Sequence, residues 1–186
     1  FGQVSMLDLR NLIQKRTVSL HLLRHLTRRM ASARMQYSHR ISKSQEKNVH
    51  AVVHESLESF IGGGDVHQGV LNLLFVSRAV DDTEVGYSTS KWIALLVKFN
   101  GQYYLYDCTG EYVGEDNLDE WKKQLATDSL TYHGPAQRIS DRVLNPRGVQ
   151  KGFTAPYISA IASLALAVRI INTGKPIDGA LFYDQF

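Results

Sequence analysis

Cysteine is almost absent from this sequence, since Cys108 is the only one among 186 residues. One thiol excludes a disulfide framework and is typical of a reducing compartment, so we expect a cytoplasmic protein. Long apolar runs are also missing, because the most apolar stretch, residues 158–171, is interrupted by Ser159, Ser163 and Arg169. That stretch is too short and too polar to cross a bilayer, and we expect no membrane partner.

The length and composition are those of one globular domain. Domains typically contain roughly 100–200 residues, and 44% hydrophobic with 21% charged residues is ordinary for them. A chain of this size buries about 70% of its unfolded surface, so we expect it to fold without a metal or a cofactor. The sequence starts at Phe1 and shows no signal peptide, and we expect one domain, residues 1–186, cut from a longer chain.

Positive charge is concentrated near the start of the sequence. Between Arg10 and Lys47 there are ten Lys or Arg and one acid, a local charge of +9 against +3 for the whole chain. Such a block can bind nucleic acid or an acidic partner, and the alternative is a solvated helix face that balances an acidic remainder. The candidate binding residues are Arg10, Lys15, Arg16, Arg24, Arg28, Arg29 and Arg34.

Helical periodicity is confined mainly to the basic N-terminal part, residues 1–61. Apolar side chains recur at three- and four-residue spacing over residues 6–37, which predicts one helix or two that meet near Thr17. A further helix is predicted over residues 49–61, ended by the glycines at 62–64.

Two histidines on that last predicted helix are four residues apart. The spacing of His50 and His54 can place two metal ligands on one helix face. No glutamate follows His50 in the metalloprotease pattern, so we expect a surface pair and no metal site.

Strand patterns dominate the second part, residues 62–186. The apolar run WIALLVKF, the turn Asn100-Gly101 and the returning run QYYLY predict a β-hairpin over residues 92–106. Four of the tyrosines cluster around it, and strand alternation predicts that some of them face solvent or a partner. The other elements that we expect are strands at 70–76 and within 130–140, a short helix at 119–125 and a buried central helix at 157–171.

These elements predict an α+β fold, in which a small mixed or antiparallel sheet packs on the central helix and on N-terminal helices. The order of the motifs in it is specific. A strand, LLFV, comes first, and the hairpin SKWIALLVKF, Asn-Gly, QYYLYDCTG follows. Gln150, in VQKGFTAPY, stands 43 residues after Asp107, just before the apolar helix. This layout resembles the ubiquitin-like-protein-specific and adenovirus-type cysteine endopeptidases, and the resemblance implies a cysteine-protease-like fold.

In those enzymes a histidine opens the first hairpin strand and is followed by tryptophan, and an aspartate ends the second strand. A glutamine that binds the oxyanion then precedes a Cys-Gly pair at the start of the central helix. By resemblance, Trp92, Asp107 and Gln150 match the tryptophan, the aspartate and the glutamine. Lys91 stands where the histidine would be, and Ala155 where the cysteine would be.

The two departures remove the chemistry that the resemblance would imply. A lysine side chain has a pKa near ~10.4 and keeps its proton at neutral pH, so it cannot replace imidazole as a base without a large shift. Alanine offers no nucleophile. Cys108 follows Asp107 directly, and strand alternation places it on the opposite face of the strand, away from such a site. An engineered Cys→Ala change can explain Ala155 but not Lys91, so a natural pseudoenzyme is favoured, with Lys91 and Asp107 forming an ion pair.

The sequence thus favours a non-catalytic, protease-like domain with a structural or protein-binding role, through a protein partner or self-assembly. A virus particle is one setting, because the resembling family includes viral members. Three alternatives remain. One is an active hydrolase that uses Lys91, Asp107 and Thr154, and another is a nucleic-acid-binding domain that uses the basic block.

The third alternative is an enzyme of another class. Ser88-Thr89-Ser90 before a strand is similar to a motif of ADP-ribosyltransferases, with Arg78 and Glu111 or Glu115 as the other candidates, although Glu-x-Glu is absent. Papain-like enzymes of the bacterial-effector type have their cysteine upstream, near residues 63–66 here, where the sequence has none.

Overall fold

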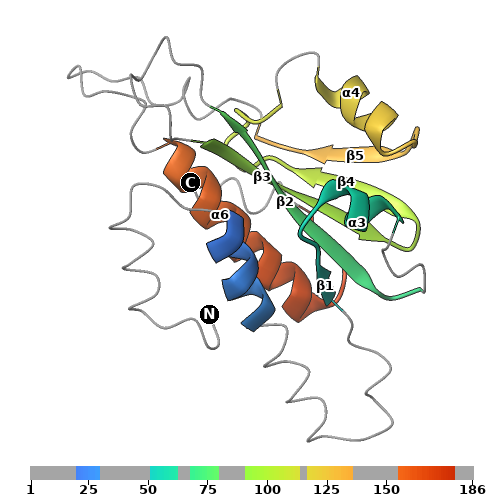
Figure 1. The fold of residues 1–186 in the computed structure, drawn as a ribbon, viewed down its shortest axis with the longest axis horizontal. Helices are drawn as coiled ribbons and strands as arrows, with labels where there is room; N and C mark the ends of the chain where they lie inside the picture. Colours follow the sequence, from blue (N-terminus) through green and yellow to red (C-terminus); the bar gives the residue numbers. More distant parts are fainter. Residues whose placement is uncertain are drawn as a thin grey trace, which may run out of the picture.

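The computed structural model describes residues 20–29, 51–62, 68–79, 91–113, 117–135 and 155–178. These residues form a five-stranded mixed sheet with helices on both of its faces (Figure 1). The strands follow one another across the sheet in chain order, and the two outer pairs, β1 with β2 and β4 with β5, are parallel. The strands are β1 (Ala51–Val53), β2 (Leu71–Ala79), β3 (Lys91–Phe99), β4 (Gln102–Tyr106) and β5 (Leu130–His133).

The predicted hairpin is confirmed as β3 and β4. Asn100 and Gly101 have φ angles of 50° and 76°, the left-handed values that a two-residue turn between antiparallel strands requires. This turn sets the register, in which Phe99 pairs with Gln102 and Leu95 with Tyr106. The predicted strand at 70–76 is confirmed as β2, and a shorter strand than the predicted range, β5, lies within 130–140.

Strand β3 is buried on both faces, which explains its nearly continuous apolar sequence. Ile93, Leu95 and Val97 belong to a core cluster with α6 (Ala155–Thr173) and the helix over residues 20–29. Trp92, Ala94 and Leu96 belong to a second cluster on the other face. That cluster includes Phe60 of α3 (Leu57–Gly62) and is bordered by Trp121 of α4 (Asn117–Gln124).

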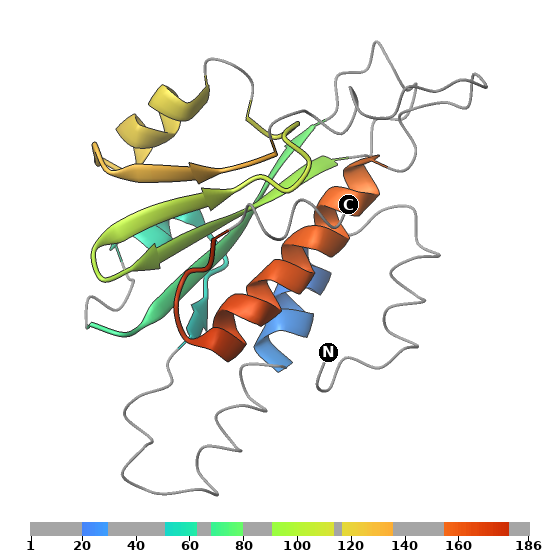
Figure 2. The ribbon, with the colours of Figure 1, turned by 180° about the vertical axis from the view of Figure 1, so that it is seen from behind.

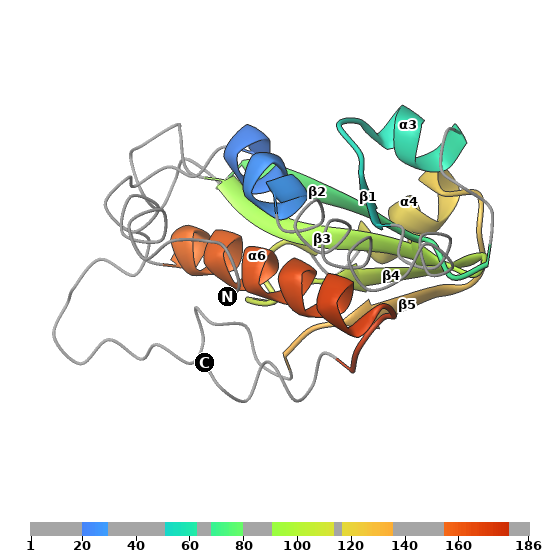
Figure 3. The same ribbon diagram turned by 90° about the horizontal axis from the view of Figure 1, so that it is seen from below.

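The two faces are called here the α6 face and the α3/α4 face. On the α6 face, α6 and the helix over residues 20–29 lie along the same side of the sheet (Figures 1 and 2). Leu23 and Leu26 of the N-terminal helix are buried there, as its apolar spacing predicts. Seen from below, α3 and α4 lie apart from α6 (Figure 3). None of the helices in the described ranges is long and apolar enough to cross a membrane.

The prediction of a helix over residues 49–61 is wrong for the first half of that range. Ala51–Val53 form the edge strand β1, paired in parallel with β2, and only Leu57–Gly62 are helical. The cause is tertiary, because two consecutive valines suit a strand when a neighbouring strand is present to pair with them. Ser56 then begins the helix, its Oγ accepting the backbone N–H of Ser59 at 3.1 Å.

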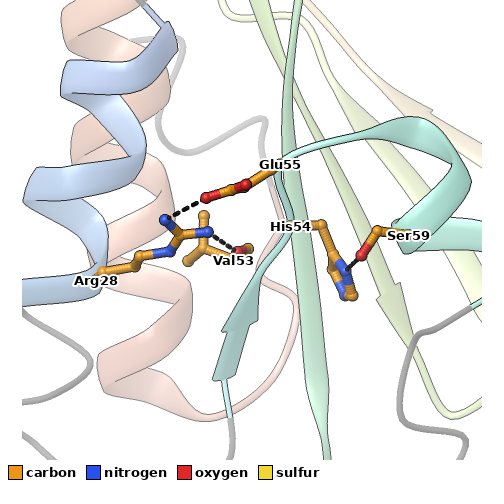
Figure 4. Close-up of polar contacts among 5 residues, drawn as sticks. All are labelled: Arg28, Val53, His54, Glu55 and Ser59. Atoms are coloured by element: carbon orange, nitrogen blue, oxygen red, sulfur yellow. Dashed lines mark hydrogen bonds and ion pairs between the residues drawn. The ribbon is translucent and has the colours of Figure 1, made fainter.

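The expected surface position of His54 is also wrong, because its side chain is only 4% exposed. Its Nε2 lies 2.8 Å from Oδ1 of the buried Asn72 in β2, and its Nδ1 lies 2.8 Å from Oγ of Ser59 (Figure 4). Phe60 packs against the imidazole edge-on. His54 therefore ties the start of α3 to the sheet, and His50 lies outside the described residues.

We predict that Asn72→Leu destabilises the protein by about 1–3 kcal/mol, because it leaves a buried imidazole nitrogen of His54 without its partner. The double variant His54→Phe/Asn72→Leu removes both polar groups and should recover part of that loss. Urea unfolding followed by circular dichroism measures the free energy of unfolding of the single and the double variant. Ser59→Ala is the matched control and should cost less, since Ser59 is exposed and water can replace its hydroxyl. A double variant no more stable than Asn72→Leu alone would contradict this account.

Candidate functional site

The end of the sheet at which β3 begins carries those positions of the resemblance that the structure describes. Two buried serines of α6, one turn apart, hold the helix to β3 there. Ser159 Oγ accepts the backbone N–H of Ile93 at 3.0 Å, and Ser163 Oγ donates to the carbonyl oxygen of Ile93 at 3.5 Å. Ala155 is one turn before Ser159, and Lys91 is two residues before Ile93, so the starts of α6 and β3 lie at the same end of the molecule. Figure 2 shows α6 running along the sheet.

Asp107 follows β4 at this end and is completely buried. Both of its carboxylate oxygens are occupied by hydrogen bonds, three from the segment that follows and one from β5. Oδ1 accepts the backbone N–H groups of Gly110 and Tyr112 at 3.1 and 3.3 Å, and Oδ2 accepts that of Val113 at 3.0 Å and the Tyr132 hydroxyl at 3.1 Å. The carboxylate therefore organises the turn after β4 and links it to β5.

Burial raises the pKa of Asp107 above its usual 3.8, although the four hydrogen bonds act in the opposite direction. The cost of placing a carboxylate inside the protein is thus offset only in part by its donors. No cation of the described residues joins it: the ion pair found among them is that of Arg28 with Glu55. Asp107 is held by dipoles rather than by a positive charge.

The expected ion pair between Lys91 and Asp107 is not formed in the part of the chain that the structure describes. Trp92 lies on the α3/α4 face and Ile93 on the α6 face, so alternation assigns Lys91 to the α6 face, where its side chain is exposed. Tyr106 lies on the α6 face, so Asp107 lies on the α3/α4 face with Tyr112. The two side chains are on opposite sides of the sheet.

Cys108 lies on the α6 face, opposite to Asp107, as alternation predicts. Its side chain is 6% exposed and packs within the core cluster that contains α6. Burial, and to a smaller extent the charge of Asp107, raises the pKa of the Cys108 thiol far above its usual value, while a hydrogen bond with Ser163 acts in the opposite direction. A buried thiol with a raised pKa is a poor nucleophile.

The residues of the alternative enzyme classes are only partly described. Arg78 donates a hydrogen bond to the backbone carbonyl oxygen of Glu111, a contact that supports the turn after β4. The remaining candidates lie outside the described residues: Ser88, Thr89, Ser90, Glu115, Gln150 and Thr154. Among the described residues no group of three His, Cys, Asp or Glu side chains is placed to hold a metal ion.

The basic block is described only at Arg24, Arg28 and Arg29, and its other four candidates, Arg10, Lys15, Arg16 and Arg34, lie outside the described ranges. The guanidinium of Arg28 binds within the protein (Figure 4). It donates to the backbone carbonyl oxygen of Val53 at 2.9 Å and pairs with Glu55 at 3.1 Å. Arg28 therefore covers the edge strand β1 and fixes the N-terminal helix to it.

One feature that sequence reasoning missed is a pocket of about 460 Å³ on the α6 face. Its lining brings together β3, β4, β5 and the segment after α6, which are far apart in the sequence. The tyrosine cluster around the hairpin was the available signal, but His133 and the later segment carry no motif. The lining residues are Phe99, Tyr104, Thr131, His133, Lys175, Pro176, Ile177 and Asp178.

Replacement of Asp107 by asparagine should destabilise the protein by roughly 2–3 kcal/mol at neutral pH, because an amide has one oxygen where the turn requires two acceptors. The difference should grow as the pH falls. Burial raises the pKa of Asp107, so the folded state binds a proton more readily than the unfolded state, and wild type gains stability as the carboxylate protonates. Urea unfolding at pH 7 and pH 5 measures this. A wild type that loses stability relative to Asp107→Asn on acidification would contradict it.

Cys108 should react with Ellman's reagent only as fast as the protein unfolds, because the thiol is buried and its raised pKa keeps it protonated. In concentrated guanidinium chloride the same reagent should titrate one thiol per chain. Rapid stoichiometric reaction in native buffer would mean that Cys108 is accessible and ionised.

Comparison with known proteins finds no family model that matches the chain. No curated protein and no solved structure matches it either. The architecture established for the chain is accordingly that of a mixed α/β domain with a five-stranded sheet.

Proposed function

We propose that the chain is a non-catalytic domain, similar in architecture to the cysteine endopeptidases named above, with a structural or protein-binding role. The observation that carries the proposal is the position of Asp107. Its two oxygens are occupied by four donors on the α3/α4 face, whereas Lys91 belongs to the α6 face. A base and the group that orients it must lie within hydrogen-bond reach of each other, and these two side chains do not.

Two further observations support a non-catalytic role. The position that corresponds to the nucleophile, Ala155, has no reactive group, and it begins a helix whose next turn is fixed to β3 through Ser159. Cys108, the only thiol, is buried and held protonated in the core. The nucleophile of a thiol hydrolase is thus replaced by Ala155, the orienting carboxylate of Asp107 lies on the other face from Lys91, and the thiol of Cys108 is buried.

The same architecture suits a binding role. Both faces of the sheet are covered and its edge strand β1 is capped by Arg28, so the domain presents a stable frame around the α6-face pocket. The resemblance to a family with viral members favours a partner within a virus particle. Nucleic-acid binding is less favoured, because the guanidinium of Arg28 is already paired with Glu55 and bonded to the backbone of Val53.

We expect the wild-type protein not to hydrolyse fluorogenic amides of ubiquitin-like proteins, or an activated ester, above the rate of a matched control protein. Lys91→Ala should behave in the same way, because the exposed Lys91 has no base role under this proposal. Lys123→Ala is the control, since it removes an equally exposed lysine from α4. Turnover that Lys91→Ala abolishes and Lys123→Ala retains would overturn the proposal in favour of an active hydrolase.

A further inference from the structure

The pocket on the α6 face is built by a turn at the end of α6. Gly174 follows the helix with a φ of 81°, and its N–H donates to the carbonyl oxygen of Ile170 at 2.8 Å. This left-handed cap turns the chain back along the sheet (Figure 2). The Tyr106 hydroxyl then donates to the carbonyl oxygen of Ile177 at 2.8 Å, which holds the segment from Lys175 to Asp178 in place as one wall.

Aromatic rings form much of the opposite wall. Tyr104 and His133 are half-buried, line the pocket, and have ring planes within 11° of parallel at a centroid distance of 6.3 Å. His133 also stacks on the buried Tyr106 at 4.7 Å. Together with Phe99, these rings make the lining partly aromatic, and another planar ring can pack against aromatic side chains.

The charges at the pocket favour a neutral occupant. Among the described lining residues, Lys175 and Asp178 are both exposed and carry one charge of each sign. Burial lowers the pKa of His133 below its usual value, although the charge of Asp178 acts in the opposite direction. A phosphate group would lie near one cation and one carboxylate, and the carboxylate would repel it. A neutral ring would not be repelled.

We propose that this pocket binds an aromatic side chain of a partner protein. The inference rests on the proposed protein-binding role and names the part of the partner that is recognised. Its volume of about 460 Å³ suits a small-molecule-sized group, and Pro176 and Ile177 add apolar surface to that of the rings. Aromatic anchors in such pockets contribute a large share of the binding energy in protein interfaces.

The test uses N-acetyl-tryptophanamide as the probe, with N-acetyl-leucinamide and AMP for comparison. Each is titrated into isotope-labelled protein, and amide and imidazole chemical shifts are followed by NMR. The tryptophan probe should bind with millimolar affinity and shift the signals of Thr131, His133 and Ile177. The leucine probe and AMP should bind more weakly.

Two pocket variants and one control test whether the tryptophan probe binds in the pocket. Tyr104→Ala removes a ring from the wall, and Thr131→Trp fills the pocket from the exposed edge strand without removing a core side chain. Both should weaken binding of the tryptophan probe at least tenfold. Tyr103→Ala is the matched control, because Tyr103 is the neighbouring tyrosine of β4 on the α3/α4 face, and it should leave the affinity unchanged.

Three outcomes would overturn the inference. They are no binding of the tryptophan probe to the wild type, equal or tighter binding of AMP, or the same loss of affinity in Tyr103→Ala as in the pocket variants. These outcomes are separate from failure of the proposed function, which is measured by hydrolysis and by Lys91→Ala at the start of β3. A hydrolase with an intact aromatic pocket and a non-catalytic domain without one give different pairs of results.

Discussion

Burial of β3 on both faces is the constraint on which the rest of this structure depends. Its alternate side chains form the centres of two core clusters, one with α6 and the N-terminal helix, the other with α3 and α4. Because both faces must be covered, helices are needed on each side of the sheet. The alternation also assigns each residue at the ends of the hairpin to one face. Lys91 and Asp107 are separated for this reason, since a side chain cannot change face without a shift of register.

Several of the buried polar side chains lie where separate segments meet. Asp107 ties the turn after β4 to β5, His54 ties α3 to β2, and Ser159 ties α6 to the start of β3. Each satisfies backbone or side-chain groups that would otherwise be buried without a partner, a situation that costs stability. A buried carboxylate can orient a catalytic base, or it can hold a loop in place. Asp107 does the second, because it accepts four hydrogen bonds.

The start of β3 and the α6 face differ in how their side chains are used. At the start of β3, the described polar side chains of Asp107 and Ser159 are engaged in structural hydrogen bonds. On the α6 face, the segment after α6 leaves a pocket with aromatic walls and balanced charges. The proposed recognition of an aromatic side chain agrees with an architecture in which helices cover both faces of the sheet and Arg28 contacts its edge strand β1.

The sequence by itself determined the hairpin, its Asn-Gly turn, β2, α4 and the buried helix α6, because these depend on local periodicity and on turn residues. It also assigned Cys108 and Asp107 to opposite faces, since alternation is a local rule. It could not show that Ala51–Val53 form a strand, because that requires β2 as a neighbour. Nor could it show that His54 is buried, that Lys91 and Asp107 do not meet, or that the α6-face pocket exists. Each of these was decided by contacts between segments distant in the chain, which only the tertiary structure brings together.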